Sequence, residues 1–519
     1  MSQISIFKAF LARVFRLFQA FKIVFNRKLI KGSIGHFTKL ADDNYDVVVV
    51  GGGISGLSAA ISASRNGAKT LLIERQGELG GLITAGWVTP FSMQMVLPDN
   101  KVIMKGLISE LFDKLAEKNG SISDWRDWKI PKLPVDKEIF KYVIHEIIED
   151  SNVNVLLNTS IVSLDCKKSR ISSINILNKS GYQKILGKTF IDATGEADIA
   201  RLSNVPMTIN NDVDPSAKTI LSDFMKNRGW VKTTEKTSSL QFAITNMDLE
   251  KTFNYICANE DMYASTTRGE LVEDITLFKY LWKEKGFFYL PHTTSFKSII
   301  EKAVKEKQIR SQIGRYKFMI HDVGIGIDAL GDSNTAIINA NRISMNPFNE
   351  NDITYCLLKG QEVCFEIFRF LKENIPGFEK SVLSAVAPYL GIRRTAQIIG
   401  DHIYTAEERM SFLKYNDVIG LASRKTSEPY EIPFSLMIPK KIKNLLVASG
   451  KTVSCDDFLP YRTKPICMAL GQAAGVAAAI SSKKNLDIRS IKMKEIQKSL
   501  LDNNVYLGDK IRLKELSLV

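Results

Sequence analysis

The stretch Tyr45–Arg75 reads YDVVVVGGGISGLSAAISASRNGAKTLLIER, and it decides the fold of the chain. Its apolar, β-branched run Val47–Val50 is typical of a parallel strand buried on both faces. Glycines at the spacing G-x-G-x-x-G come next. The residues of 58–65 then predict a helix, and those of 69–73 predict a second buried strand. The order of strand, glycine loop, helix and strand predicts a doubly wound α/β fold that binds a dinucleotide.

Each glycine of this loop has a physical role in dinucleotide binding. Gly51 permits the tight turn, Gly53 lets backbone N–H groups approach a pyrophosphate, and Gly56 lets helix and strand pack closely. The phosphates are expected at the positive end of the helix. Glu74, at the end of the second strand, is expected to accept hydrogen bonds from a ribose 2′-hydroxyl, and an acid there argues against a 2′-phosphate. A tight β–α turn without a ligand is the alternative.

Composition and charge limit the partners of the protein. The formal net charge is +14, but residues 1–40 hold eight Lys or Arg and no acid, so the rest of the chain carries only a small positive excess. A nucleic-acid partner is therefore not expected. The six cysteines form no C-x-x-C pair and the five histidines are scattered, which predicts reduced thiols in a cytosolic compartment and no metal site.

Residues 4–30 carry apolar side chains at helical spacing, and basic residues interrupt every run that could span a bilayer. The segment also lacks the small-residue cleavage site of a secretory signal. We interpret it as a basic amphipathic helix that lies on an anionic membrane, which predicts a cytoplasmic protein, peripheral on the inner face of a membrane. A helix that docks on the main body of the protein and an organellar presequence are the alternatives.

Further segments repeat the features of a nucleotide-binding sheet. Residues 77–86 form a glycine-dense loop that lets backbone run beside a ligand. Short alternating runs in 153–185 predict a small antiparallel β-meander. Residues 188–193 and 443–449 predict two more buried strands, each followed by glycine, and 465–480 predict a helix so rich in Ala and Gly that it must pack closely on another element.

In this order, the segments resemble FAD-dependent oxidoreductases of the glutathione-reductase-like flavoprotein superfamily. The matching stretches are DVVVVGGGISGLSAAISASRNGAKTLLIERQGELGGLITAGWVTPF, FIDATGEADIARLSNVP, DITYCLLKGQEVCFEIFRFLKENIPGFEKS, APYLGIRRTAQIIGDHIYT, YEIPFSLMIPKKIKNLLVASG and PICMALGQAAGVAAAI. They cover most of residues 45–482, but the match is weak over 206–330 and absent from the N-terminal helix. The resemblance implies an α/β fold with FAD as cofactor. A Rossmann-like FAD-binding domain, of parallel sheet and small antiparallel β-meander, would carry an inserted α+β substrate domain.

The resemblance, together with the basic N-terminal segment, implies a division of the chain. Residues 1–43 are the basic amphipathic helix or tail, 44–205 the first part of the FAD-binding domain, 206–435 the substrate domain, 436–482 the closing part of the FAD-binding domain, and 483–519 a C-terminal tail.

The family pattern assigns cofactor-binding roles by position. The glycine loop and the acid after the second strand would hold the ADP half of FAD, Gly80 and Gly81 would pass beside the pyrophosphate, and the backbone of Val162 would meet adenine. The N-terminus of the last helix would lie at the flavin and stabilise the negative charge of the reduced ring. The full predicted set is Gly51, Gly52, Gly53, Ile54, Ser55, Gly56, Glu74, Arg75, Gly80, Gly81, Val162, Ala193, Thr194, Gly195, Asp198, Gly450, Met468, Leu470 and Gly471.

Two departures from the family pattern affect the predicted catalytic residues. Lys451 follows Gly450 where arginine is common, and the loop over the flavin is short and lacks its usual histidine. The predicted catalytic residues are Arg394, Arg462, Tyr461 and Asp456. Arg394 and its neighbour Arg393 could bind a carboxylate or carbonyl oxygen, with a structural ion pair as the alternative. Arg462 would bind substrate or stabilise reduced flavin, and Tyr461 and Asp456 would transfer protons.

The sequence therefore predicts an FAD-dependent oxidoreductase that transfers hydride between an organic substrate and flavin N5. The substrate would be small, with hydrophobic compounds among the candidates, and an external electron donor or acceptor would complete the cycle. The alternatives are a fumarate-reductase-like reductase of a C=C bond, a membrane-associated flavin-binding protein that has lost catalysis, and an NAD-binding dehydrogenase.

Overall fold

The computed structural model describes residues 44–92, 94–209, 237–263, 265–291, 295–310, 312–313, 316–317, 324–331, 335–393, 395–456 and 458–519. The predicted amphipathic helix of residues 4–30 and the predicted catalytic residue Arg394 lie outside this part of the chain.

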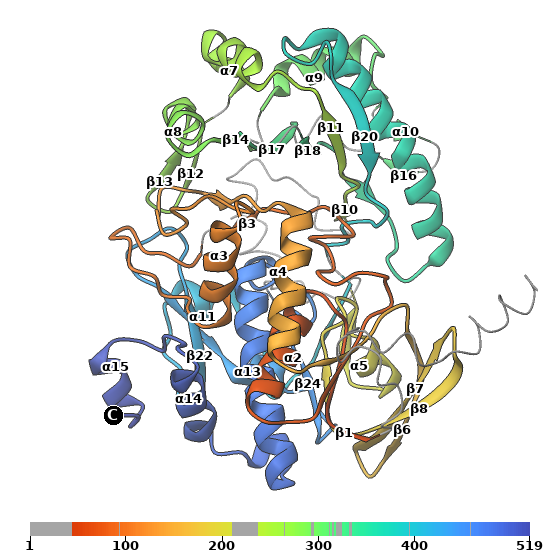
Figure 1. Cartoon of the computed structure of the whole chain (residues 1–519), viewed down its shortest axis with the longest axis vertical. Helices are drawn as coiled ribbons and strands as arrows, with labels where there is room; N and C mark the ends of the chain where they lie inside the picture. Colours follow the sequence, from red (N-terminus) through yellow and green to blue (C-terminus); the bar gives the residue numbers. More distant parts are fainter. Residues whose placement is uncertain are drawn as a thin grey trace, which may run out of the picture. The chain divides into compact units, whose positions relative to one another are not determined.

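A seven-stranded sheet carries the glycine loop (Figure 1). Its strands are β1 (Asn44–Val50), β2 (Thr70–Ile73), β5 (Asn154–Leu156), β6 (Ser160–Lys167), β7 (Arg170–Asn178), β8 (Gly181–Asp192) and β24 (Leu445–Val447). The order is β5-β2-β1-β8-β7-β6, and β24 also pairs with β8. Strands β5, β2, β1, β8 and β24 run parallel, whereas β6, β7 and β8 form the predicted antiparallel meander. This arrangement confirms the predicted α/β fold.

Strand β8 is longer than the sequence pattern indicates. We expected one strand in the meander and a separate buried strand at 188–193, but the structure has a single strand that runs through Gly187. Its first half pairs with β7 and its second half pairs with β24. Gly187 does not break the strand, because its missing Cβ makes room for Phe190 and Val48 of the sheet. The meander is therefore a direct extension of the parallel sheet.

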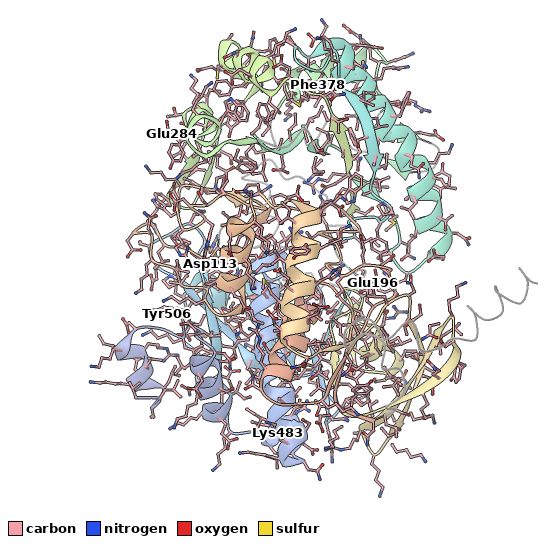
Figure 2. All side chains as sticks on the ribbon, in the orientation of Figure 1. Asp113, Glu196, Glu284, Phe378, Lys483 and Tyr506 are labelled. Atoms are coloured by element: carbon pink, nitrogen blue, oxygen red, sulfur yellow. The ribbon has the colours of Figure 1, made fainter. Side chains whose placement is uncertain are left out.

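Two helices cover the sheet at the glycine loop. Helix α2 (Ile54–Arg65) follows the loop, and α13 (Lys464–Lys484) packs on it along most of its length. Lys483 marks the end of α13 in Figure 2. Within the described residues, α13 is the one helix long and apolar enough to cross a membrane, but 89% of its apolar window is buried inside the protein. It is therefore the core helix of this fold.

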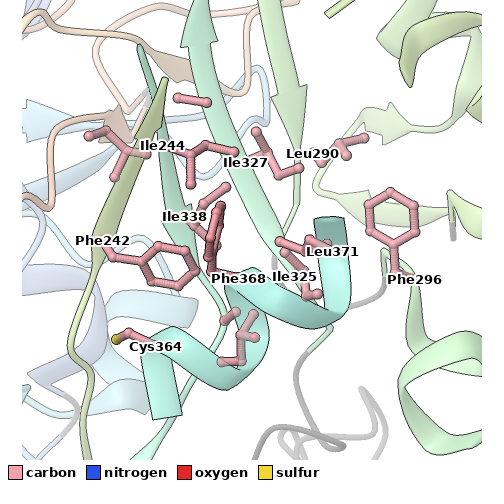
Figure 3. Packing of buried hydrophobic residues seen from close by; sticks show 14 of the residues in the cluster. Phe242, Ile244, Leu290, Phe296, Ile325, Ile327, Ile338, Cys364, Phe368 and Leu371 are labelled. Carbon is pink, nitrogen blue, oxygen red and sulfur yellow. The ribbon is translucent and has the colours of Figure 1, made fainter. Parts of the chain in front are cut away.

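A second sheet contains five antiparallel strands in the order β14-β17-β18-β11-β20. These strands are β14 (Phe287–Leu290), β17 (Gly326–Leu330), β18 (Thr335–Asn339), β11 (Phe242–Thr245) and β20 (Val382–Val386), and α10 (Glu350–Asn374) contacts β20. Their apolar side chains form one hydrophobic cluster with Phe368 and Leu371 of α10, which Figure 3 shows. Most side chains of β14, β17, β18 and β11 are buried, and they share one hydrophobic core with α10.

The hydrophobic cluster of this second sheet extends from Leu240 to Ile392, with Trp87 as a further member. The later strands lie with the first sheet's elements: β21 (Ala396–Ile398) pairs with β9 (Met207–Ile209), and β22 (Val418–Ala422) contacts α13. The predicted limits 206–435 of the substrate domain stay a prediction. The predicted tail 483–519 contains the end of α13, the short helix η4 (Ile488–Ser490) and the helices α14 (Met493–Asp502) and α15 (Lys510–Glu515).

The remaining elements include α3 and α4, which pack on each other and on the helices of the first sheet. In chain order, these remaining elements are β3 (Phe91–Ser92), α3 (Leu107–Glu117), β4 (Lys132–Leu133), α4 (Lys137–Asp150), α5 (Asp198–Leu202), β10 (Thr237–Ser238), α7 (Leu249–Ala258), η2 (Glu260–Met262), β12 (Thr266–Arg268), β13 (Leu271–Glu273), α8 (Ile275–Lys285), α9 (Lys297–Lys305), β15 (Gln312–Ile313), β16 (Tyr316–Lys317), β19 (Ile343–Ser344), α11 (Ala406–Met410), β23 (Tyr430–Pro433), η3 (Phe434–Met437), α12 (Phe458–Tyr461), η4 (Ile488–Ser490), α14 (Met493–Asp502) and α15 (Lys510–Glu515).

Candidate cofactor and active site

The three glycines of the loop after β1 differ in what surrounds them. A Cβ atom on Gly51 would lie 2.6 Å from the carbonyl oxygen of Ala193, and one on Gly56 would lie 1.7 Å from the carbonyl oxygen of Gly51. Gly53 has open space instead, because the nearest atom to its Cβ position is the Cα of Gly81 at 4.0 Å. Gly51 and Gly56 are thus required by the packing of the protein itself, whereas the space beside Gly53 is open.

The N-terminus of α2 faces the same loop. Its N-cap, Gly53, has no side chain to cap the helix, and the first turn contains no acidic residue. The first N–H groups of a helix need an acceptor from outside it, and a phosphate is a common one. Ile54 and Ser55, both predicted to bind cofactor, begin this helix. The open space at Gly53 and the uncapped helix end fit the pyrophosphate of FAD.

The second glycine loop lies directly against the first. The N–H of Gly80 donates to the carbonyl oxygen of Gly52 over 2.9 Å, and Gly80 also pairs with Gly53 in an isolated parallel bridge. Gly81 has φ +57°, and its Cβ would lie 2.9 Å from the Cα of Gly53. The structure therefore brings together the two loops that the sequence predicts for the pyrophosphate.

Glu74 is fixed at the end of β2 beside the glycine loop. Its side chain is 7% exposed and accepts hydrogen bonds from the N–H of Gly52 and, at 2.8 Å, from the N–H of Gln76. These bonds hold the carboxylate in one orientation, as a ribose-binding group requires. The neighbouring Arg75 turns away toward Glu196, with 3.3 Å between Nη1 and the carboxylate.

Val162 lies on β6, where the pairing with β7 is irregular. Ser160 and Ile161 pair with Leu177 and Ile176, and the register shifts before Ser163. Such a bulge takes one residue out of the regular ladder. The predicted contact between the Val162 backbone and adenine is compatible with this geometry and stays a prediction.

A group of acidic side chains lies at the carboxyl end of β8. Asp192 is fully buried and accepts hydrogen bonds from the backbone N–H and hydroxyl of Thr194. Burial raises the pKa of Asp198 to about 6, and the charges of Asp192 and Glu196 add to the effect. Glu196 is labelled in Figure 2. We call the two adjacent loops, residues 51–56 and 80–81, the glycine cradle. Ala193 and Thr194 border it, because their backbone atoms would lie 2.6 and 2.8 Å from a Cβ on Gly51. The predicted roles of Gly195 and Asp198 stay predictions.

The segment after β24 approaches α13 closely at Gly450. A Cβ atom on Gly450 would lie 1.8 Å from the carbonyl oxygen of Tyr461, which also accepts a 3.5 Å hydrogen bond from the thiol of Cys467. Lys451 extends from here beside Gly195 and donates to the carbonyl oxygen of Ile392 over 3.0 Å. Lys451 therefore links the cofactor sheet to the segment that carries Arg393.

Two of the predicted flavin contacts on α13 have other neighbours. Gly471 lies against the backbone of Ser55 on α2, where a Cβ would be 2.1 Å from the carbonyl oxygen. Met468 lines a small cavity with Gly420 and Pro465. These contacts favour packing roles for Gly471 and Met468. Leu470 is fully buried in the same helix, and its contact with the ring stays a prediction.

The predicted proton-transfer residues Asp456 and Tyr461 are held in structural contacts. The carboxylate of Asp456 accepts a 2.8 Å hydrogen bond from the N–H of Ala406 at the start of α11. The ring of Tyr461 is 1% exposed and packs edge-on against Tyr404, with 5.3 Å between centroids. These contacts favour roles in holding the loop, and a catalytic role for either residue stays a prediction.

The charges of three arginine side chains from distant segments act on one another. The three residues are Arg342, which follows β18, Arg393, which follows β20, and Arg462, two residues before α13. Burial is the main cause of the lowered pKa of all three arginines. The positive charge of Arg462 lowers the pKa of Arg342 and of Arg393 further. The site is therefore strongly electropositive.

Lys464 and Asp328 are two candidate residues that the sequence analysis missed. Burial, together with the charges of Lys132 and Arg462, lowers the pKa of Lys464 to about 7, and its Nζ donates to the carbonyl oxygen of Pro90 over 2.7 Å. Burial raises the pKa of Asp328 on β17 to about 6, and its Oδ1 atom has no hydrogen-bond partner. No local motif marks either residue, because their partners come from distant segments.

Within the described residues, no group of three His, Cys, Asp or Glu side chains could hold a metal ion.

Three features together define a Rossmann-like dinucleotide-binding enzyme: the parallel sheet, the uncapped helix after the glycine loop and the acid at the end of β2. The sequence model of the FAD dependent oxidoreductase family matches residues 46–500, and the chain belongs to this family. FAD is accordingly its cofactor.

Curated relatives match over part of the chain. The digeranylgeranylglycerophospholipid reductase of Methanococcus aeolicus is 28% identical over 172 residues, which are 32% of this chain and 42% of that protein. The protein of the same name from Methanocaldococcus jannaschii is 29% identical over 126 residues, 24% of this chain and 31% of that protein. The chain thus spans less than half the length of these relatives.

Solved structures of flavoproteins are similar over most of the chain. A geranylgeranyl bacteriochlorophyll reductase-like protein from Thermoplasma acidophilum has 12% identity and a TM-score of 0.43, with 91% of both chains covered. The flavin-dependent brominase Bmp2 has 10% identity and a TM-score of 0.40, covering 92% of this chain and 93% of its own.

Proposed function

We propose that this FAD-dependent oxidoreductase transfers hydride between an organic substrate and flavin N5, and that the reaction is the reduction of a C=C bond. The observation that carries the proposal is a group of three buried cations, Arg393, Arg462 and Lys464, of which Lys464 begins α13. Lys451 links the residue before Arg393 to Gly195 of the cofactor sheet. When bound, FAD supplies two-electron chemistry at N5. An external electron donor would reduce the flavin again.

The residues of the cradle would hold the cofactor from its ADP end. Backbone N–H groups at the start of α2 would bind the pyrophosphate, and Glu74 would accept hydrogen bonds from the ribose. The α13 N-terminus would then lie at the flavin, where its positive end favours negative charge on the reduced ring.

The reduction of a C=C bond needs a proton in addition to the hydride. One carbon receives the hydride, and its neighbour must receive a proton from a group whose pKa lies near the working pH. Lys464, with a pKa of about 7, fits this role, and Asp328, with a pKa of about 6, could pass protons to it. The ammonium group of Lys464 would lose the proton and be recharged from solvent.

The names of the curated relatives support this choice of reaction. Two of them are called reductases of a digeranylgeranylglycerophospholipid, a name that describes a lipid substrate. A lipid substrate for this chain would agree with the membrane contact that the sequence predicts for residues 4–30, on the cytoplasmic side of a membrane. We include this location in the proposal.

The first experiment is the visible spectrum of the purified protein, followed by anaerobic oxidation of the reduced enzyme. We expect an oxidised-flavin spectrum, FAD in the supernatant after heating, and faster return of the yellow colour with alkenes than with their saturated analogues. A bound flavin that no alkene reoxidises faster than free reduced flavin would contradict the proposed reaction. That result would favour the alternative of a flavin-binding protein without catalysis.

A further inference from the structure

We propose that Arg342, Arg393 and Arg462 form a binding site for an anionic group of the substrate, a carboxylate or a phosphate, at the flavin end of the cofactor site. The inference rests on the proposed function, because it names the class of substrate for the same site. We call these three residues the arginine cluster.

Residues 239–240 hold both chain segments that carry Arg342 and Arg393. The N–H of Gly391 donates to the carbonyl oxygen of Ser239 over 2.8 Å. The side chain of Asn341 accepts a hydrogen bond from the N–H of Leu240 and donates one to its carbonyl oxygen, at 2.8 and 2.7 Å. Asn341, next to Arg342, and Gly391, two residues before Arg393, are therefore both hydrogen-bonded to residues 239–240.

Arg393 is also tied to the cofactor sheet. Lys451, in the segment after β24, donates to the carbonyl oxygen of Ile392, the residue before Arg393. Arg462 lies between α12 and α13, and its charge acts on both other arginines. The cluster therefore lies between the second sheet and the N-terminus of the helix expected at the flavin.

The cluster has N–H groups without acceptors. Nη1 of Arg393 and Nε of Arg462 are buried and have no hydrogen-bond partner. A buried guanidinium normally pairs with a carboxylate, because loss of hydration is otherwise uncompensated. Here the charges of Arg342 and Arg462 add to burial in lowering the pKa of Arg393. An anion bound between them would relieve the repulsion and accept the free N–H groups.

Each arginine of the cluster keeps part of its surface accessible, although burial is the main cause of its lowered pKa. Guanidinium groups bind carboxylate and phosphate oxygens through pairs of N–H donors, so either anion suits the cluster. An anion held here would position the rest of the substrate toward the flavin and Lys464.

The test measures binding of small anions to the oxidised, FAD-loaded protein by difference absorbance of the flavin and by calorimetry. The probes are crotonate, inorganic phosphate and crotonamide, which has the shape of crotonate without its charge. We expect saturable binding of crotonate or phosphate and none of crotonamide at the same concentration. Tighter binding of one anion identifies the group as carboxylate or as phosphate.

Arg393→Gln and Arg462→Gln should each raise the anion Kd about tenfold or more, because each removes a charge-assisted hydrogen bond. Arg310→Gln is the matched control, since Arg310 pairs with Glu366 at the surface, and its Kd should equal that of the wild type. The FAD Kd and circular dichroism verify folding. If a glutamine variant fails to fold, Arg393→Lys replaces it, with an expected smaller rise in Kd.

Equal binding of crotonamide and crotonate would overturn the inference, as would unchanged anion binding in both glutamine variants. A changed flavin potential in these variants without any anion binding would assign the arginines to the reduced flavin and also overturn it. The proposed function fails separately. Anion binding without alkene reduction would support the anion site and contradict the proposed reaction. Reduction of neutral alkenes without anion binding would support the reaction and contradict the anion site.

Discussion

Gly471 of α13 lies against the carbonyl oxygen of Ser55 in the first turn of α2, where a Cβ atom would be only 2.1 Å away. One helical turn further, a Cβ on Gly475 would lie 2.2 Å from the carbonyl oxygen of Ala59. The two helices thus touch backbone to backbone. Because α2 begins at the glycine cradle and α13 begins at the arginine cluster, this contact fixes the distance between the two ends of the cofactor site.

Gly471→Ala is expected to destabilise the protein by about 1–3 kcal/mol, since overpacking a tight contact forces the helices apart. The measurement is the midpoint of urea unfolding. Gly420→Ala is the control, because its Cβ would lie at an ordinary 3.8 Å from Ala469. Equal midpoints for the two variants would contradict the close helix contact.

Gly53→Ala is expected to fold normally and to lose FAD. The protein has room for the new methyl group, whose nearest neighbour would be 4.0 Å away, but the methyl would occupy the space predicted for the pyrophosphate. The measurements are the unfolding midpoint and the FAD content of the purified protein. A variant that stays yellow would refute the assignment of this loop to the phosphates.

Gly56→Ala provides the matched comparison for Gly53→Ala. Its Cβ would lie 1.7 Å from the carbonyl oxygen of Gly51, so we expect a loss of stability as well as of FAD. The two variants together separate a glycine required by the ligand from a glycine required by the fold.

The sequence predicts the cofactor half of the protein well because its signals are local. The run Val47–Val50, the glycines after it and Glu74 lie within one βαβ unit, where pattern and structure correspond directly. The Ala- and Gly-rich composition of α13 also predicts its close packing, although not its partner. The partner α2 becomes visible only in the folded chain, because the contact joins residues that are far apart in sequence.

The candidate active site could be predicted only in part. Arg393 and Arg462 follow from the family pattern, but Arg342, Lys464 and Asp328 carry no motif and gain their properties from burial beside each other. Asp456, in contrast, has a suitable side chain for proton transfer, and its hydrogen bond to Ala406 favours a structural role. Residue type and position in the chain therefore do not separate candidate active-site residues such as Lys464 from structural residues such as Asp456.

Glu74→Gln is expected to weaken FAD binding about tenfold, because the neutral amide is a poorer acceptor for the ribose hydroxyl than the carboxylate. The side chain keeps its size, so the hydrogen bond from the N–H of Gly52 can persist. The measurement is the FAD Kd from flavin fluorescence. Glu78→Gln is the control, because Glu78 pairs with Lys141 instead, and an equal effect of both variants would contradict the role of Glu74.

Deletion of residues 1–40 is expected to move the protein from vesicles that contain anionic lipids to the soluble fraction. The deletion removes eight basic residues and no acid, and each basic residue near an anionic surface contributes about 1 kcal/mol to binding. Flotation with and without anionic lipid measures the effect. An unchanged distribution would favour a helix that docks on the protein.

Lys464→Gln tests the proposed proton donor through the pH dependence of alkene reduction. Burial lowers the pKa of Lys464 to about 7, so the ammonium form, which carries the proton, decreases as the pH rises through about 7. We therefore expect kcat/KM of the wild type to fall above this pH. In the Lys464→Gln variant the rate should be lower by about 10²–10⁴-fold, the usual contribution of a positioned acid, and the fall in kcat/KM at high pH, the descending limb of the profile, should be absent.

Lys483→Gln, at the exposed end of α13 (Figure 2), is the control and should keep the wild-type rate and pH profile. A descending limb that persists in Lys464→Gln would assign the proton to another group, with Asp328 the next to be tested.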